Sequence, residues 1–216
     1  MQKELVLMDI LKSLQWRYAT KKFDTTKTLT NQQINTLKEA FNLTATSYGL
    51  QPIKMIVIQN KELQKQLVPH SMNQQQVGDA SHVLVLCVQN ELTTHDIENY
   101  FNLVKESRNT PDKILHPFKE HLKESFPLKS NNEIFLWAKN QAYLALGNLL
   151  TVAAVEHIDA CPMEGFDPKK YSEVLQLKKH AISPVLVLPV GFRANDDYMK
   201  DLAKVRKKTT DMVIEI

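Results

Sequence analysis

The sequence has few of the residues on which several common binding motifs depend. It contains only five glycines in 216 residues, and none stands in a GxGxxG or GxxxxGKS/T arrangement, which argues against a Rossmann dinucleotide site and a phosphate-binding P-loop. The two cysteines, Cys87 and Cys161, form no CxxC pair, and the seven histidines form no HExxH motif. No GxSxG sequence marks a serine nucleophile. We therefore expect neither a metal site nor hydrolase chemistry.

The chain also lacks a strong charge bias and a long apolar run. Its formal net charge is +3, too small for the positive field of a dedicated nucleic-acid binder, so a small anionic ligand fits better. The most apolar helical stretch, residues 142–155, is shorter than the roughly 20 residues that span a bilayer. The charges of Lys3, Glu4 and Asp9 are unlike a signal peptide. These features predict a soluble cytoplasmic protein with no nucleic-acid or membrane partner.

Residues 1–216 alternate between helix and strand patterns and have the length of one domain. Thr30 and Gln33 match a capping box at the start of a helix, and Asp167 stands where it can cap a helix that begins at Pro168. Further predicted helices and strands follow from the spacing of apolar residues: helices over residues 5–16, 31–43, 61–68 and 132–156, and strands over 54–59, 82–89, 181–192 and 212–216. The last strand has no obvious partner nearby in the sequence.

Residues 93–130 are charged and helical in pattern, and Pro111, Pro117 and Pro127 break that pattern. We expect a helical excursion that stands partly outside the core, near the active site. The helix that follows, residues 132–156, is apolar around much of its circumference, so it should be buried on several sides. A second subunit could cover the face that one chain leaves open.

Four segments combine polar side chains with loop-like surroundings. They are residues 17–24 (RYATKKFD), 46–52 (TSYGLQP), 73–76 (NQQQ) and 162–166 (PMEGF), the last completed by residues 204–206 (KVR). Taken singly, the first resembles a solvated basic connector, the second an ordinary turn, and the KVR segment a solvated tail. Together, in this order and at these separations, they resemble the oxygen-insensitive NAD(P)H nitroreductase family, FMN-dependent enzymes related to dihydropteridine reductase. The resemblance spans almost the whole chain.

The resemblance implies that the two ends of the chain bind the FMN phosphate. Arg17, Lys204 and Arg206 match the cations that hold the phosphate in this family, and Lys21 matches a lysine that contacts the flavin ring and the ribityl chain. Arginine and lysine bind a phosphate dianion through charge-assisted hydrogen bonds. The other implied cofactor contacts in the first three segments are Tyr18, Ala19, Thr46, Ser47, Gly49, Gln51, Asn73 and Gln76.

The segment PMEGF resembles the family loop whose backbone amides approach the reactive N5 of the flavin. This places Met163, Glu164 and Gly165 against the ring, where a glycine lets the backbone come close to a flat surface. Glu164 and Lys21 are thus expected near the ring, but no side chain is required as a dedicated acid or base. Tyr48 and Phe118 are expected to line the substrate side of the pocket.

Three of the implied cofactor-contact positions depart from the family pattern: Ala19 stands in place of a serine, Gly49 in place of an asparagine, and Gln76 in place of a lysine seen in close relatives. These departures keep a second hypothesis open, in which the chain is a flavin-binding or sensor protein of the same fold without turnover. A third hypothesis is an interaction protein that uses its basic tail on nucleic acid.

The fold implied by the resemblance is α+β, with a mixed, largely antiparallel sheet flanked by helices. The family forms a domain-swapped homodimer in which the C-terminal strand, here residues 212–216, adds to the partner's sheet, and FMN lies at each subunit boundary. NADH or NADPH would deliver a hydride to flavin N5, and a nitroaromatic, a quinone or a similar small acceptor would take it up in a ping-pong cycle. The protein would position and tune the cofactor, which carries the chemistry.

Overall fold

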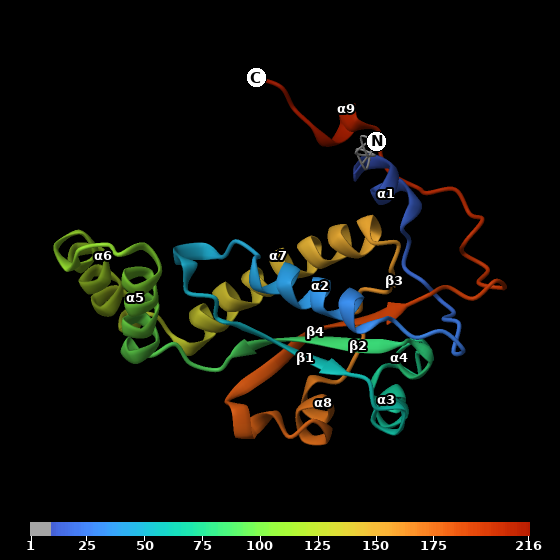
Figure 1. Cartoon of the computed structure of the whole chain (residues 1–216), viewed down its shortest axis with the longest axis horizontal. Coiled ribbons are helices and arrows are strands. Elements are labelled where there is room, and N and C mark those ends of the chain that lie inside the picture. Colours follow the sequence, from blue (N-terminus) through green and yellow to red (C-terminus); the bar gives the residue numbers. More distant parts are fainter. Residues whose placement is uncertain (1–9) are drawn as a thin grey trace, which may run out of the picture.

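Four strands form the centre of the fold in the computed structural model, which describes residues 10–216 (Figure 1). Their order in the sheet is β1-β2-β4-β3, and all three pairs of neighbouring strands are antiparallel. The sequence predicts a mixed sheet. Among the described residues, the parallel pairing consists of one isolated bridge between Ala19 and Ala160. The bounds of the strands are β1 Ile53–Ile58, β2 His82–Gln89, β3 Asp159–Ala160 and β4 Ile182–Gly191.

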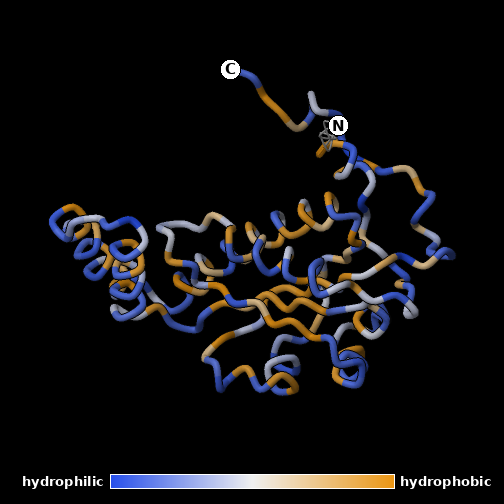
Figure 2. Tube along the Cα trace, in the orientation of Figure 1, coloured by the Kyte–Doolittle hydropathy of each residue, from blue (hydrophilic) through white to orange (hydrophobic). Residues whose placement is uncertain are grey.

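Helices cover both faces of the sheet because β2 and β4 carry apolar side chains on both faces. In β2, Leu84 and Leu86 belong to one core cluster, whereas the alternate residues Val83 and Val85 belong to another. The first cluster is covered by α2 and α7, and the second by α3, α4 and α8 (Figures 1 and 2). Figure 2 shows the resulting apolar strands between two helical layers. The α+β arrangement expected from the sequence is confirmed.

Local signals in the sequence start several helices. Thr30 and Gln33 form both bonds of the predicted capping box, and the side chain of Asp167 accepts hydrogen bonds from two backbone amides of the helix that begins at Pro168. The bounds of these elements are α1 Ile10–Trp16, α2 Asn31–Asn42, α3 Lys61–Leu67, α4 Gln76–Asp79 and α8 Pro168–Val174, with short 3-10 turns at Ser47–Gly49, Val68–His70 and Leu177–His180. Residues 5–9 of the first predicted helix lie outside the described residues.

Two helices, α5 (Thr94–Arg108) and α6 (Asp112–Ser125), stand at one end of the molecule (Figure 1). Their buried residues Ile97, Phe101 and Leu122 form a separate apolar cluster with Phe126, which directly follows α6. Pro111 is the N-cap of α6, and Pro127 lies in the 3-10 turn Phe126–Leu128 that follows it.

Pro117 does not break the helical pattern as the sequence predicted, because it lies inside α6. A proline in a helix removes the bond to the carbonyl four residues earlier, which here belongs to Lys113. Both Pro117 and Lys113 are exposed, so water can satisfy that carbonyl. The cost of the proline is thereby reduced, and α6 continues through it.

Helix α7 (Asn131–Val155) is the longest element, and it crosses the whole sheet (Figure 1). Nine of its residues are buried, but Leu136 and Leu144 remain 48% and 55% exposed. The chain ends with a short helix, α9 (Thr209–Met212), after which Val213 has extended backbone angles. The predicted strand 212–216 therefore does not form within the described part of a single chain.

Candidate functional site

The basic connector near the start of the chain lies beside β3 and the loop that follows it. The amide of Thr20 donates to the carbonyl of Ala160, next to the Ala19–Ala160 bridge. Burial raises the pKa of the Cys161 thiol, and the positive charges of Lys21 and Arg17 act in the opposite direction. Both cations therefore border the loop that begins at Pro162. The fold thus joins the first and fourth predicted segments.

The C-terminal basic segment crosses the same connector and encloses a cleft of about 660 Å³ with it. Arg17, Lys204 and Arg206 all line this cleft. The ammonium of Lys204 donates to the backbone carbonyl of Arg17. The chain's two ends therefore meet in one hollow, as their predicted common ligand requires.

The three cations of the cleft repel one another. Burial and the nearby charge of Arg206 lower the pKa of Arg17, and burial, Arg17 and Arg206 lower the pKa of Lys204. Within residues 10–216, none of the three forms an ion pair with a carboxylate. Positive charge gathered without a carboxylate favours an anionic ligand.

Asp197 is a site residue that the sequence analysis missed. The residue is only 2% exposed, and its carboxylate accepts hydrogen bonds from the Tyr18 hydroxyl (3.0 Å), from the amides of Lys21 (2.9 Å) and Lys22 (3.1 Å), and from the amide of Met199 (2.9 Å). Burial raises the pKa of Asp197, but these hydrogen bonds outweigh it and leave the pKa below its usual value. The residue stands in FRANDDY, a composition typical of an ordinary turn.

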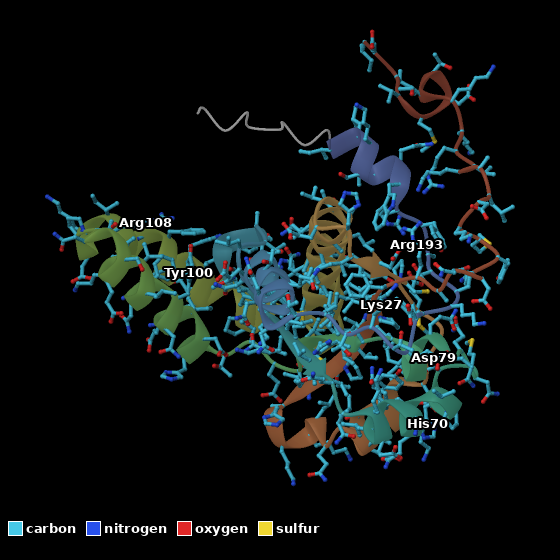
Figure 3. All side chains as sticks on the ribbon, turned by 45° about the vertical axis from the view of Figure 1, so that its right-hand side comes forward. Lys27, His70, Asp79, Tyr100, Arg108 and Arg193 are labelled. Carbon is cyan, nitrogen blue, oxygen red and sulfur yellow. The ribbon has the colours of Figure 1, made fainter. Side chains whose placement is uncertain are left out.

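Arg193 holds the aromatic residues of the connector. Its guanidinium lies 4.1 Å from the centre of the Trp16 ring and 4.5 Å from that of Tyr18, while Asp159 pairs with it at 2.6 Å. Trp16 also packs edge-on against His157, at 4.9 Å between ring centres. Figure 3 labels Arg193 beside the connector. Because its charge is paired, this arginine supports the cleft rather than adding to the free positive charge.

The third predicted segment meets the fourth on the same side of the molecule. The side-chain amide of Gln74 donates to the carbonyl of Gly165 at 3.3 Å, and a Cβ atom at Gly165 would lie 3.0 Å from the sulfur of Met72. Asn73 has a positive φ of 57° and is exposed, whereas Gln76 is largely buried. The two predicted amide residues, Asn73 and Gln76, therefore lie on the same side of the molecule as the fourth segment.

The loop of the fourth segment has its backbone fixed by β4. Met163 exchanges two backbone hydrogen bonds with Val187, at 2.8 and 3.1 Å, and its side chain is buried in the core, so it can contact a ligand only through its backbone. Glu164 is exposed, and its carboxylate accepts a 2.7 Å hydrogen bond from the hydroxyl of Tyr143 on α7. That bond raises the pKa of Tyr143. The predicted ring-facing residues therefore stand on a rigid support.

The second predicted segment, residues 46–52, is held by α7 and α5, whereas the fourth segment is held by β4. The amide of Ser47 donates to the side-chain oxygen of Gln141 at 2.8 Å, and the amide of Gln51 donates to the hydroxyl of Thr46 at 3.2 Å. Gly49 has a φ of +74°, and a Cβ atom there would lie 2.4 Å from the hydroxyl oxygen of Tyr100. Tyr100 thus occupies the space that a larger residue at position 49 would need.

Tyr48 and Phe118, the two predicted substrate contacts, belong to one group of aromatic rings. The centre of the Tyr48 ring lies 6.4 Å from that of Phe118, 5.6 Å from that of Phe126 and 6.1 Å from that of Trp137. Tyr48 and Phe118 are each 44% exposed. The fold therefore places both predicted substrate residues on one exposed aromatic surface.

Within one chain, the predicted site residues form two groups: loop 46–51, beside the first half of α7, and the residues of the cleft, beyond its C-terminal end. The loop of Glu164 reaches α7 at Tyr143, close to Gln141. Loop 46–51 contacts Gln141 in the first half of the helix, whereas Trp16 contacts His157 just after its end. From Gln141 to Val155 an α-helix rises about 21 Å. Tyr100, on the side of loop 46–51, and Arg193 lie far apart in Figure 3, and their elements do so in Figure 1. One chain alone therefore does not bring all four segments together.

The described residues hold no group of three or more His, Cys, Asp or Glu side chains arranged to bind a metal. Among them, no helix has both the length and the apolar character needed to cross a membrane. Cys87 and Cys161 are both buried and unpaired with each other.

Comparisons with known proteins agree with this geometry. Residues 14–192 match the model of the nitroreductase family. A Staphylococcus epidermidis protein provisionally named NAD(P)H nitroreductase is 32% identical over 212 residues, which cover 94% of this chain and 95% of the relative.

Two solved structures have the same fold. A nitroreductase-like protein of Streptococcus mutans superposes with a TM-score of 0.83 at 23% identity, covering 95% of this chain and 97% of its own. A protein of Exiguobacterium sibiricum, crystallised in complex with FMN, gives 0.83 at 19% identity, covering 96% and 97%. The chain therefore belongs to the nitroreductase family and is an oxidoreductase enzyme of that family, as the four segments predicted.

Proposed function

We propose that this enzyme binds FMN and uses NADH or NADPH to reduce nitroaromatics, quinones or similar flat acceptors. The observation that carries the proposal is the cleft in which Arg17, Lys204 and Arg206 gather without a carboxylate partner. A phosphate dianion would relieve their mutual repulsion. That a relative of the same fold was crystallised with FMN supports this choice of anion.

The residues beyond the cleft also fit a flavin. Gly165 adds no side chain of its own to the loop, the backbone of Met163 is fixed by β4, and Asn73 offers an amide that can both donate to and accept from the pyrimidine edge. Ala19 contributes no side-chain hydrogen bond, so its position can serve only through its backbone. These residues would hold the ring, and the three cations would hold the phosphate.

Bound FMN would supply hydride acceptance from the nicotinamide and delivery of reducing equivalents to the acceptor. The protein's part is then electrostatic and geometric. The ammonium of Lys21 would stabilise negative charge at the pyrimidine end of the ring, which favours the reduced form. Glu164, fixed by Tyr143, would orient its loop against the ring. Tyr48 and Phe118 would receive the flat acceptor on their exposed aromatic surface.

We further propose that the enzyme is a homodimer of single-domain subunits, residues 1–216, in which loop 46–51 of one subunit completes the flavin site of the other. The separation of the two groups of site residues along α7 supports this assembly, as does the exposed apolar face of that helix at Leu136 and Leu144. The extended, exposed residues 213–216 would add to the partner's sheet. The excursion 93–130 would then stand near the partner's flavin.

Purified protein is expected to be yellow, to lose its flavin absorbance on anaerobic addition of NADH or NADPH, and to regain it when a nitroaromatic or a quinone is added. Protein that is colourless and does not bind added FMN would refute the proposal. The flavin-binding alternative without turnover is favoured by one observation, the filling of the space at Gly49 by Tyr100. Stopped-flow mixing separates the two, since only the enzyme has its bound FMN reduced rapidly by a nicotinamide.

A further inference from the structure

The buried carboxylate of Asp197 joins two segments that are about 180 residues apart in the chain. One of its oxygens accepts from the Tyr18 hydroxyl and from the amides of Lys21 and Lys22, and the other accepts from the amide of Met199. Tyr18 and Lys21 belong to the basic connector, and Met199 begins the run that leads to Lys204. Hydrogen bonds to a charged acceptor are roughly twice as strong as those between neutral groups.

We propose that Asp197 is a positioning residue that locks the C-terminal run 199–206 onto the connector 17–22 and thereby sets the affinity of the cleft for the FMN phosphate. This inference rests on the proposed binding of FMN. The inference goes beyond FMN binding because it assigns the alignment of Lys204 and Arg206 with Arg17 to a single residue that does not touch the ligand.

The geometry favours positioning over direct binding. A carboxylate would repel a phosphate, and four donors of the protein already engage the two oxygens of Asp197. The run from Met199 to Arg206 contains no regular helix or strand beyond turns, and its residues are mostly exposed. Apart from the bond of Lys204 to the Arg17 carbonyl, this segment has few contacts to fix it, so the anchor at its start governs where Lys204 and Arg206 lie.

The neighbouring residue offers a matched control. Asp196 is exposed, and its carboxylate pairs only with the side chain of Lys22 among the interactions of the described residues. Asp197→Asn and Asp196→Asn therefore make the same change in charge at adjacent positions. Only the first places an amide nitrogen where one of the two clamping oxygens stood, which removes at least one accepted hydrogen bond.

The test compares the affinities of the apoprotein for FMN and for riboflavin, which lacks the phosphate, by quenching of flavin fluorescence. We expect Asp197→Asn to weaken FMN binding at least about tenfold while riboflavin affinity changes less than about threefold. Asp196→Asn should match the wild type for both ligands. Equal losses of both ligands in Asp197→Asn, or unchanged preference for FMN over riboflavin, would overturn the inference.

Tyr18→Phe removes only one of the four hydrogen bonds and serves where Asp197→Asn does not fold. A smaller loss of the same kind, confined to FMN, is expected, and an unchanged preference for FMN would contradict the role assigned to Asp197. Wild-type protein that binds neither flavin would instead refute the proposed function itself. The two failures are thus distinguishable in one set of titrations.

Discussion

At the residue scale, the arginines around the cleft divide according to whether their charge is paired. Arg193 is paired with Asp159 and stacked between two aromatic rings, so it belongs to the framework. Arg17 and Arg206 have no carboxylate partner among residues 10–216, and the pKa of Arg17 is lowered by its burial and by Arg206. Sequence alone does not show that Arg193 is paired, because Asp159 lies 34 residues away from it in the chain.

Arg206 is proposed to bind the phosphate and Lys21 to act on the flavin ring. These different roles give a prediction for two alanine variants. Arg206→Ala should weaken FMN binding but leave the rate at which nicotinamide reduces the bound flavin nearly unchanged, because the lost charge acts on the phosphate. Lys21→Ala should also slow that reduction, by about tenfold or more, since it removes a cation from the ring. Equilibrium titration and anaerobic stopped-flow absorbance measure the two quantities.

Lys207→Ala is the matched control, because Lys207 is an exposed basic residue next to Arg206 that does not line the cleft. It should bind FMN as the wild type does. Losses of affinity alone, equal in Arg206→Ala and Lys21→Ala, would show that Lys21 has no separate role at the ring.

At the scale of single elements, a glycine in loop 46–51 is closely surrounded, whereas a glycine in helix α7 is not. Gly49 combines a φ of +74° with a Cβ position 2.4 Å from the Tyr100 hydroxyl, whereas a Cβ at Gly147, in the middle of α7, would meet nothing within 4 Å. The same substitution, glycine to alanine, should therefore have opposite effects at the two positions.

We expect Gly49→Ala to lower the free energy of unfolding of the apoprotein by about 1–3 kcal/mol, because alanine is strained at this φ and the Tyr100 ring must move. Gly147→Ala should raise it by up to about 1 kcal/mol, because alanine has the higher helix propensity. Urea denaturation followed by circular dichroism measures both. A Gly49→Ala variant as stable as the wild type would show that loop 46–51 is not held in the conformation described.

The sequence predicts best those elements whose start or pattern is set by residues only a few positions apart. The capping box at Thr30 and the cap at Asp167 act within a few residues, and β2 is recognisable from an unbroken apolar run. Pro117 shows the limit of such rules, because its exposure, which lessens the cost of a proline, depends on how α6 packs. Asp197 shows another limit, since its four partners lie up to 179 residues away.

At the scale of the whole molecule, the length of α7 separates loop 46–51 from the basic cleft within a single chain. The basic cleft lies beyond the C-terminal end of α7, and loop 46–51 contacts Gln141 in its first half. Tyr100, beside that loop, and Arg193, beside the cleft, lie far apart in Figure 3. Four motifs in the right order identified the family, but their order says nothing about this separation. The distance follows from the length of one helix, which only the assembled fold reveals.

The division of the site along α7 has a consequence for genetics. If each flavin site takes its cleft from one subunit and its loop from the other, a variant with a defective cleft and a variant with a defective loop can complement each other. Arg206→Ala damages the cleft, and Ser47→Trp would block the loop at an exposed position. In a mixed dimer, one site carries both lesions and the other carries none.

Coexpression of these two variants should restore about a quarter of the wild-type sites when subunits pair at random, provided that the assay uses an FMN concentration that fills the wild-type site but not the weakened Arg206→Ala site. Two differently tagged copies, purified through both tags, would concentrate the mixed dimers and bring the activity to about half. No recovery in the doubly purified sample would show that each subunit builds its site alone. A single crossing helix would thus make the two subunits of the proposed dimer depend on each other for complete sites.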